Sequence, residues 1–192
     1  MESVAILLFS ALKNGDPFGA YFFNDKHQEY IPPKKGRRHL LHVFQKMILA
    51  FESSSFCGAN HKAAFHFFNR VAKHHGVCFF LSDDISPESK KEMRIATRKH
   101  DLLFLCPVDP MEEKGNFPQG FLSQNIETGE YMNCDLSPEK QKIFQDLRKQ
   151  RKQKRIQFLR SLGIPLVHLK TNESLFATLL AFFQKRQHAL AR

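Results

Sequence analysis

The 192-residue sequence has no tryptophan, nine glycines and four cysteines, and these scarcities exclude several kinds of site. The glycines form no Gly-x-x-x-x-Gly-Lys loop, no Gly-x-Gly-x-x-Gly turn and no Gly-x-Ser-x-Gly elbow, so the common nucleotide-binding and serine hydrolase motifs are missing. Cys57, Cys78, Cys106 and Cys134 form no Cys-x-x-Cys pair of the kind that binds zinc or carries redox chemistry. We expect a protein that is not an enzyme, with buried free thiols in the reducing cytoplasm.

The sequence also lacks a long apolar run and a surplus of acidic residues. The apolar stretch at residues 4–9 is too short to span a bilayer and follows no basic segment, so we expect neither a membrane span nor an export signal. Twenty-nine Lys and Arg residues outnumber nineteen Asp and Glu residues, which gives a formal net charge of +10. Such a charge attracts nucleic acid, anionic lipid or an acidic protein surface, and it does not choose among them.

Phenylalanine is abundant, with twenty residues that often occur in pairs. We interpret these pairs as packing residues. A chain of this length with 42% hydrophobic residues can bury about 70% of its unfolded surface, which favours a single domain over residues 1–192.

The spacing of apolar residues predicts alternating helices and strands. Helices are expected at residues 2–13, 40–48, 61–74, 86–100, 137–162 and 173–186. Strands are expected at residues 18–23, 28–31, 77–81, 102–106 and 164–169, with a further hairpin between residues 107 and 136. The continuous apolar run at residues 77–81 indicates a strand that is buried on both faces. The pattern predicts an α/β fold with a doubly wound, mostly parallel sheet and an inserted β-hairpin.

Asp83 and Asp84 directly follow the predicted strand at residues 77–81. Ligands of open α/β sheets bind at the carboxyl ends of the strands, so these carboxylates are candidates for binding a divalent cation. The sequence favours the alternative that one of them caps the following helix or loop. A metal-dependent hydrolase built on the pair is the weakest interpretation, because no general base or second ligand cluster accompanies it.

Two pairs of histidines, His61 with His66 and His74 with His75, raise the same question of metal binding. No carboxylate or thiol accompanies them at helical ligand spacing. We therefore interpret them as solvated side chains.

Two clusters of basic residues are candidates for electrostatic contact. Arg37 and Arg38 follow Gly36 at the expected start of a helix, a position that can bind an anion. The larger cluster occupies two turns of the long predicted helix without one apolar residue, and we expect this part of the helix to face solvent or a partner on all sides. Its residues are Arg148, Lys149, Arg151, Lys152, Lys154 and Arg155. A solvated helix face is the alternative, because no aromatic residue lies among the charges for stacking with single-stranded nucleic acid.

A series of short motifs along the whole chain resembles one known family. The motifs are Phe9-Ser10-Ala11-Leu12-Lys13-Asn14-Gly15-Asp16-Pro17-Phe18-Gly19, Tyr30-Ile31-Pro32-Pro33, Gly36-Arg37-Arg38-His39-Leu40-Leu41, Leu81-Ser82-Asp83, His100-Asp101-Leu102, Val108-Asp109-Pro110, Glu127-Thr128-Gly129-Glu130 and Leu162-Gly163-Ile164. Their order resembles the domain of unknown function 58 family, whose members are von Willebrand factor A-like proteins.

The resemblance implies a central strand ahead of Met1 that ends in an Asp-x-Ser-x-Ser loop, the first part of a metal-ion-dependent adhesion site. This chain lacks that section, so the resemblance implies a sheet without its first central strand, whose neighbours have unpaired edges. Ala59 stands where the family pattern has a threonine ligand, which leaves Asp83 as a vestigial metal ligand. Mg²⁺ binding would then need the missing segment from elsewhere. A truncated reading frame, a split gene and a degenerate paralogue each explain this pattern.

These features lead to two hypotheses of function. The first is a non-enzymatic, cytoplasmic, von Willebrand factor A-like interaction module, for which the resemblance implies a MoxR-type AAA+ ATPase as partner. The second is a basic nucleic-acid-binding protein that acts through residues 149–155 together with Arg37 and Arg38, with an affinity that falls as salt rises.

Overall fold

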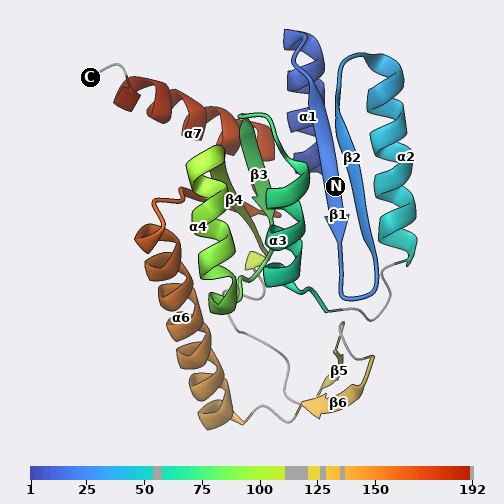
Figure 1. Ribbon diagram of the computed structural model, residues 1–192. Coiled ribbons are helices and arrows are strands. Elements are labelled where there is room, and N and C mark those ends of the chain that lie inside the picture. Colours follow the sequence, from blue (N-terminus) through green and yellow to red (C-terminus); the bar gives the residue numbers. More distant parts are fainter. Residues whose placement is uncertain (54–57, 111–120, 126–128, 135–136, 191–192) are drawn as a thin grey trace. The chain divides into compact units, whose positions relative to one another are not determined.

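The computed structural model describes residues 1–53, 58–110, 121–125, 129–134 and 137–190 (Figure 1). The chain divides into two compact units, of which unit 1 is Met1–Ala72 with Ser123–Met132 and unit 2 is Lys73–Leu122 with Asn133–Arg192. Its strands form three sheets, with the orders β1-β2, β3-β4-β7 and β5-β6. The domain organisation predicted from the sequence, a single domain, stays a prediction.

The Met1–Ala72 part of unit 1 contains a β-hairpin and three helices. Its elements in chain order are α1 (Glu2–Asn14), β1 (Phe18–Phe23), β2 (Gln28–Lys34), α2 (Arg37–Ser53) and α3 (His61–Val71). Gly15 ends α1 with a left-handed φ of 72°, and its amide donates to the carbonyls of the last helical turn. Asn60 begins α3, because its side chain accepts a hydrogen bond from the amide of Ala63 over 2.9 Å.

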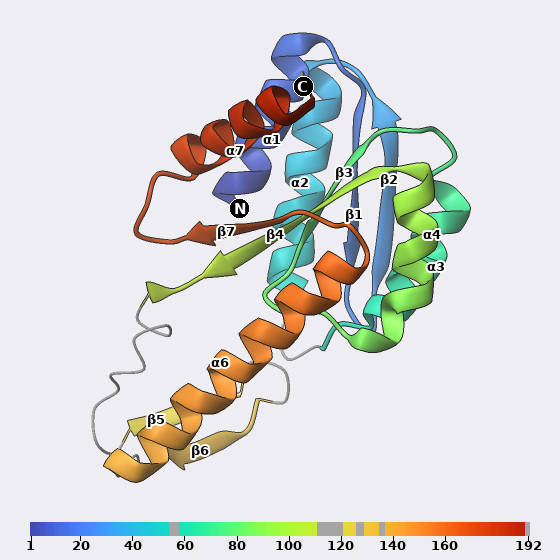
Figure 2. The same ribbon diagram turned by 90° about the vertical axis from the view of Figure 1, so that its left-hand side faces the viewer.

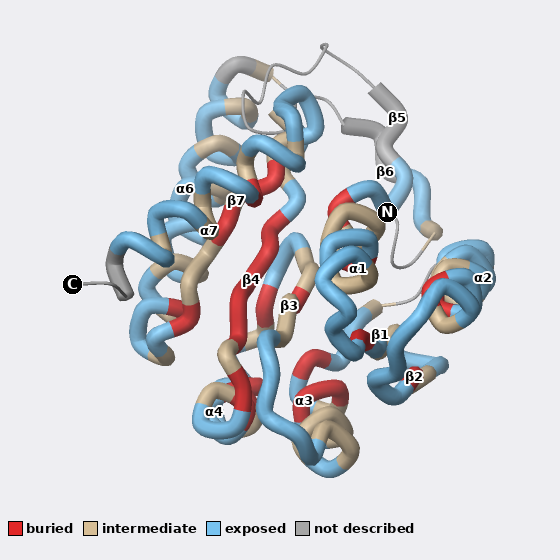
Figure 3. Tube along the Cα trace, turned by 90° about the horizontal axis from the view of Figure 1, so that it is seen from above, coloured by how far each residue is buried: buried red, intermediate tan, exposed pale blue. Residues whose placement is uncertain are grey.

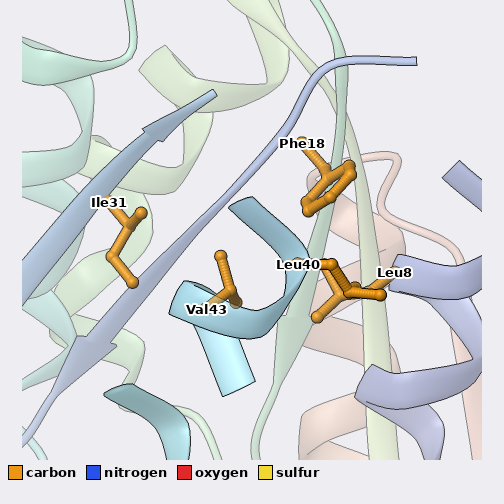
Figure 4. Close-up of a cluster of buried hydrophobic side chains, with 5 residues drawn as sticks. All are labelled: Leu8, Phe18, Ile31, Leu40 and Val43. Carbon is orange, nitrogen blue, oxygen red and sulfur yellow. The ribbon is translucent and has the colours of Figure 1, made fainter. Parts of the chain in front are cut away.

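Apolar side chains cover both faces of the β1-β2 hairpin. On one face, α1 and α2 pack against β1 around a buried core (Figure 4). This core contains Leu8, Phe18, Ile31, Leu40 and Val43. On the other face the ring of Phe67, from α3, stacks on Tyr21 with 5.2 Å between ring centroids. The alternation of side chains along β1 therefore places successive aromatic residues on opposite faces.

Gly19 allows the two strands of the hairpin to approach closely. The register between β1 and β2 shifts by one residue at this position, which is a β-bulge. A Cβ atom at Gly19 would lie 2.4 Å from the carbonyl oxygen of Ile31 and 2.9 Å from the nitrogen of Pro33. Any larger residue would force the strands apart.

Unit 2 contains a three-stranded parallel sheet with helices packed against it. Its elements are β3 (Val77–Leu81), the 3-10 helix η1 (Pro87–Ser89), α4 (Lys90–Lys99), β4 (Asp101–Val108), α6 (Pro138–Ser161), β7 (Leu166–Lys170) and α7 (Leu175–Leu190). The hairpin of β5 (Phe121–Gln124) and β6 (Tyr131–Cys134) lies between β4 and α6 in the sequence (Figure 2). The predicted parallel sheet and inserted hairpin are confirmed.

The core of unit 2 lies around β4, the middle strand. Leu102 to Cys106 are all buried, as Figure 3 shows for most of this strand. Helix α4 contributes the fully buried Met93, and α7 packs against β7. From α7, Phe183 also reaches the ring of Phe79, 6.0 Å away on β3. An ion pair of 2.6 Å between Arg186 and Asp101 joins the same helix to the start of β4.

The prediction that residues 77–81 form a strand buried on both faces is wrong. The residues do form β3, but Val77 is 57% exposed and Cys78, Phe79 and Leu81 are half-buried. The reason is that β3 is an edge strand of the three-stranded sheet, and its only partner among the described strands is β4. No helix within the described ranges is both long enough and apolar enough to cross a membrane.

Candidate functional site

The carboxyl end of β3 brings together residues that the sequence assigns to two separate sites. Asp83 follows β3, and its backbone carbonyl accepts a hydrogen bond from the guanidinium of Arg155 on α6. The thiol of Cys106, on β4, lies 3.7 Å from the same carbonyl. The candidate metal ligand and the last member of the basic cluster are therefore neighbours, joined through the backbone and not through the Asp83 carboxylate.

Burial makes the thiol of Cys106 unreactive. Desolvation is the largest effect and raises the pKa of this thiol, and the carboxylates of Asp83 and Asp84 raise it further. The positive charges of Arg155 and Lys152 act in the opposite direction but do not reverse the shift. At neutral pH Cys106 is therefore a neutral thiol, and a neutral thiol is a poor nucleophile.

The environment of Asp83 also disfavours a divalent cation. The guanidinium of Arg155 places a positive charge beside the position that a metal ion would occupy. Asp83 and Asp84 are both exposed, and the described part of the chain contains no group of three or more His, Cys, Asp or Glu side chains able to bind a metal. The predicted capping role is not seen at the next helix either, because Ser86 accepts the hydrogen bond from the Glu88 amide at the start of η1.

The prediction that residues 148–155 face solvent or a partner on all sides is wrong for one side of the helix, which packs against the same chain. Arg155 is half-buried against the carboxyl end of β3, and Leu159, one turn later, is fully buried. Arg148 is also half-buried, with its guanidinium 5.4 Å from the centre of the Phe144 ring. The other four cations of the cluster, Lys149, Arg151, Lys152 and Lys154, are exposed.

The outward side of α6 combines apolar and basic side chains. Ile143 is 60% exposed and Leu147 is 50% exposed, and the exposed Arg151 and Lys154 follow them. Intervals of four, four and three residues place these side chains on one face of a helix. We call the surface made by Ile143, Leu147, Arg151 and Lys154 the α6 face. The two exposed apolar residues in it fall outside the basic cluster that the sequence indicates.

The second predicted basic pair lies in unit 1. Arg37 and Arg38 are exposed at the first turn of α2, directly after Gly36, whose φ of 101° is left-handed. The next residue, His39, lies with its Nε2 atom 2.8 Å from the carbonyl oxygen of Phe18, which fixes this helix end to β1. The pair is therefore held at a well-anchored helix start, as the sequence predicts.

A further basic surface, on α4, is missed by the sequence reasoning. Lys90, Lys91, Arg94 and Arg98 line a shallow groove of about 570 Å³ together with Ile95. The signal is present in the sequence, because Lys90, Arg94 and Arg98 recur every four residues and so share one face of a helix.

One of the four histidines that the sequence raises for metal binding is not solvated. His61 is buried at the start of α3 and packs edge-on to Phe23 with 6.1 Å between ring centroids, so the solvated interpretation is wrong for this residue. His66, His74 and His75 are exposed.

The residues just before α3 contact the hairpin of unit 1. The amide of Asp25 donates a hydrogen bond to the carbonyl of Gly58 over 2.9 Å. Ala59 is exposed and offers no hydroxyl.

Comparison with family models confirms the part of the resemblance that concerns the domain of unknown function 58 family. The model of the family described as "Protein of unknown function DUF58" matches residues 1–157. The chain belongs to the DUF58 family. No curated protein has a matching sequence. Among solved structures, the DUF58 chain is similar to the conserved hypothetical protein BatB from Bacteroides thetaiotaomicron, with 13% sequence identity and a TM-score of 0.44, over 97% of this chain and 87% of that chain.

Proposed function

We propose that this DUF58 protein is a non-enzymatic, von Willebrand factor A-like interaction module that binds an acidic protein surface through the α6 face. The observation on which the proposal rests is the exposure of Ile143 and Leu147 on the same helical face as Arg151 and Lys154. Exposed apolar residues next to a cluster of one charge are typical of a surface that binds another protein.

The two halves of the α6 face would contribute differently to binding. Ile143 and Leu147 would be buried in the complex and supply most of the affinity, since apolar anchors at the centre of an interface cost the most when truncated. Arg151 and Lys154 would direct the approach of an acidic partner and exclude basic ones. A net charge of +10 supports an acidic partner over a neutral one.

A MoxR-type AAA+ ATPase is the partner that we propose. This choice rests on the family resemblance of the motifs, and the α6 face supplies the surface on which such an ATPase would bind. The buried Cys106, which is held as a neutral thiol, supports a binding role over nucleophilic catalysis by this residue.

Copurification with a MoxR-type ATPase tests the proposal. The wild-type chain should retain the ATPase, and the double charge reversal R151E/K154E should abolish retention. K13E/K26E is the matched control, because it changes the net charge by the same amount at exposed positions of unit 1. Equal loss with both variants would indicate a general charge effect, and no retention by the wild-type chain would refute the partner.

The apolar half of the face is tested separately. The substitution L147D should weaken retention by roughly tenfold or more, because a hot-spot apolar residue contributes about 2 kcal/mol to binding. The control E139A removes an exposed side chain at the start of the same helix and should leave retention unchanged. Retention that depends on Arg151 and Lys154 but not on Leu147 would show that the contact is only electrostatic.

Nucleic-acid binding is the second candidate function, and the run of cations from Arg148 to Arg155 without an acidic residue favours it. Arg155 is not available to a phosphate while it binds the Asp83 carbonyl, which reduces the exposed set. Gel-shift titration at two salt concentrations separates this function from protein binding, since phosphate contacts weaken steeply as salt rises. Absence of retardation at low salt would rule it out.

A further inference from the structure

Four cations share one face of helix α4. Lys90, Arg94 and Arg98 recur at intervals of four residues, and Lys91 lies three residues before Arg94, so the helical spacing brings them together. All four are exposed, and they line the shallow groove of about 570 Å³ together with Ile95. We call the surface made by Lys90, Lys91, Arg94 and Arg98 the α4 face. Because one helix supplies all four residues, the spacing of these charges is a property of unit 2 alone.

This arrangement of charges is unfavourable for the helix by itself. Like charges four residues apart repel each other, as Lys90 does with Arg94 and Arg94 with Arg98. Lys90 and Lys91 also lie in the first turn of α4, where the partial positive charge of the helix N-terminus disfavours cations. Among the described residues, no ion pair involves any of the four side chains. An anion bound against the α4 face would therefore be attracted by all four charges.

The α4 face is poorly suited to an apolar partner. Burial of unpaired charges costs free energy, so this face either stays in water or meets negative charges. A protein partner would also need apolar anchors at the centre of the contact, and the apolar residue of this groove, Ile95, is only 37% exposed. The α6 face differs, because Ile143 and Leu147 are 60% and 50% exposed. A uniformly anionic surface therefore fits the α4 face better than a protein surface does.

We propose that the α4 face binds the phosphate backbone of double-stranded nucleic acid without reading its sequence. Lys90 and Arg98 are eight residues apart, which is about 12 Å along a helix axis. A duplex carries one negative charge about every 1.7 Å of its axis, so several phosphates lie within this length. Arginine binds phosphate through paired N–H groups and lysine binds it as a point charge. The described residues that line the groove include no aromatic ring, so stacking with a single strand is not supported.

Fluorescence anisotropy with a short labelled DNA duplex, measured from low to physiological salt, tests the proposal. The logarithm of the wild-type association constant should fall linearly with the logarithm of the salt concentration. The double substitution R94A/R98A should make this slope shallower by about 1.8, because each lost phosphate contact removes about 0.9. Two duplexes of unrelated sequence should bind equally, since contacts to phosphate carry no sequence information.

R151A/K154A is the matched control, because it removes two positive charges from exposed positions of α6, within the run of cations on which the second candidate function rests. It should leave the slope unchanged, and thermal unfolding checks that both variants are folded. Three results would each overturn the proposal: no binding of the duplex by the wild-type chain at low salt, an unchanged slope in R94A/R98A, or an equal decrease in R151A/K154A.

Two further probes distinguish the duplex from other polyanions. A labelled peptide of glutamate residues with the same net charge should bind more weakly than the duplex, and so should a single strand of the same sequence. Tighter binding of the peptide that is lost in R94A/R98A would assign the α4 face to an acidic protein and overturn the proposal. Tighter binding of the single strand would overturn the assignment to a duplex. The proposal is independent of the proposed function, because R94A/R98A leaves every residue of the α6 face unchanged.

Discussion

The guanidinium of Arg155 donates a hydrogen bond to the backbone carbonyl of Asp83, across 72 residues of sequence. This contact fixes the C-terminal half of α6 to the carboxyl end of β3, where α/β proteins usually bind their ligands. A basic residue from the predicted interaction cluster therefore acts as a structural anchor, and it introduces a positive charge where the sequence predicts a vestigial metal ligand. Arg151 and Lys154 are exposed on the α6 face.

Removal of the anchor should destabilise unit 2. We expect R155A to lower the free energy of unfolding by about 1.5 kcal/mol, because hydrogen bonds to charged groups contribute at this level. K154A, at the exposed neighbouring position, should change it by less than about 0.5 kcal/mol. D83N should also be mild, since the backbone carbonyl and not the carboxylate accepts the bond. Urea denaturation measures all three, and a large effect of D83N would contradict this assignment.

Magnesium should not stabilise the chain. The charge of Arg155 opposes a dication beside Asp83, and a ligand set of one exposed carboxylate binds Mg²⁺ poorly. Thermal unfolding with and without excess Mg²⁺ should give the same midpoint within error. A rise in midpoint that is lost in D83N would show that Asp83 is a functional ligand despite the neighbouring guanidinium.

Gly19 should be intolerant of any side chain. The substitution G19A places a Cβ atom 2.4 Å from the Ile31 carbonyl oxygen, and the strands of the hairpin must separate to accept it. We expect a loss of at least about 2 kcal/mol in the free energy of unfolding. G76A is the control, because nothing lies within 4 Å of a Cβ at that position. Similar stability of the two variants would show that the bulge adapts.

The described thiols should react slowly while the chain is folded. Burial raises the pKa of Cys78 to about 12 and also raises the pKa of Cys106, so the thiolate is scarce at neutral pH. Iodoacetamide at pH 7.5, followed by peptide mass mapping, should leave both residues unmodified until urea unfolds the chain. Rapid modification of Cys106 in the folded protein would indicate that the carboxyl end of β4 opens to solvent.

Stability of unit 1 should depend weakly on pH through Glu29. The hydrogen bond from Lys46 is the main cause that lowers the pKa of this carboxyl group, over an ion pair of 2.6 Å. A lowered folded-state pKa means that the ion pair stabilises the fold above the unfolded pKa of about 4.3, and that this contribution is lost as pH falls through the folded value. E29Q should therefore lower the free energy of unfolding by about 0.5 kcal/mol at pH 7 and leave it unchanged at pH 2. An equal loss at both pH values would indicate that Glu29 stabilises the fold by packing and not by its charge.

Local patterns were sufficient to predict most of the elements. The strand at residues 18–23 and the strand at residues 77–81 have the predicted bounds, and the helix expected at residues 2–13 ends one residue later, at Asn14, where Gly15 caps it. Such features depend on the spacing of apolar residues and on the conformational freedom of glycine, both of which are encoded within a few neighbouring positions. The motif order is likewise a property of the sequence, and it is the basis of the family assignment.

The neighbours of each side chain required the tertiary structure. A run of five apolar residues looks the same in a middle strand and in an outer strand, so the sequence could not tell that Val77 would be exposed. His61 is buried because the ring of Phe23 comes to it from the hairpin, and Arg155 turns inward because β3 ends beside α6. The sequence by itself determined the elements and the family, since these follow from local spacing and motif order. The tertiary structure decided which polar side chains are buried and which strand lies at the edge of the three-stranded sheet, because both depend on contacts between residues distant in the chain.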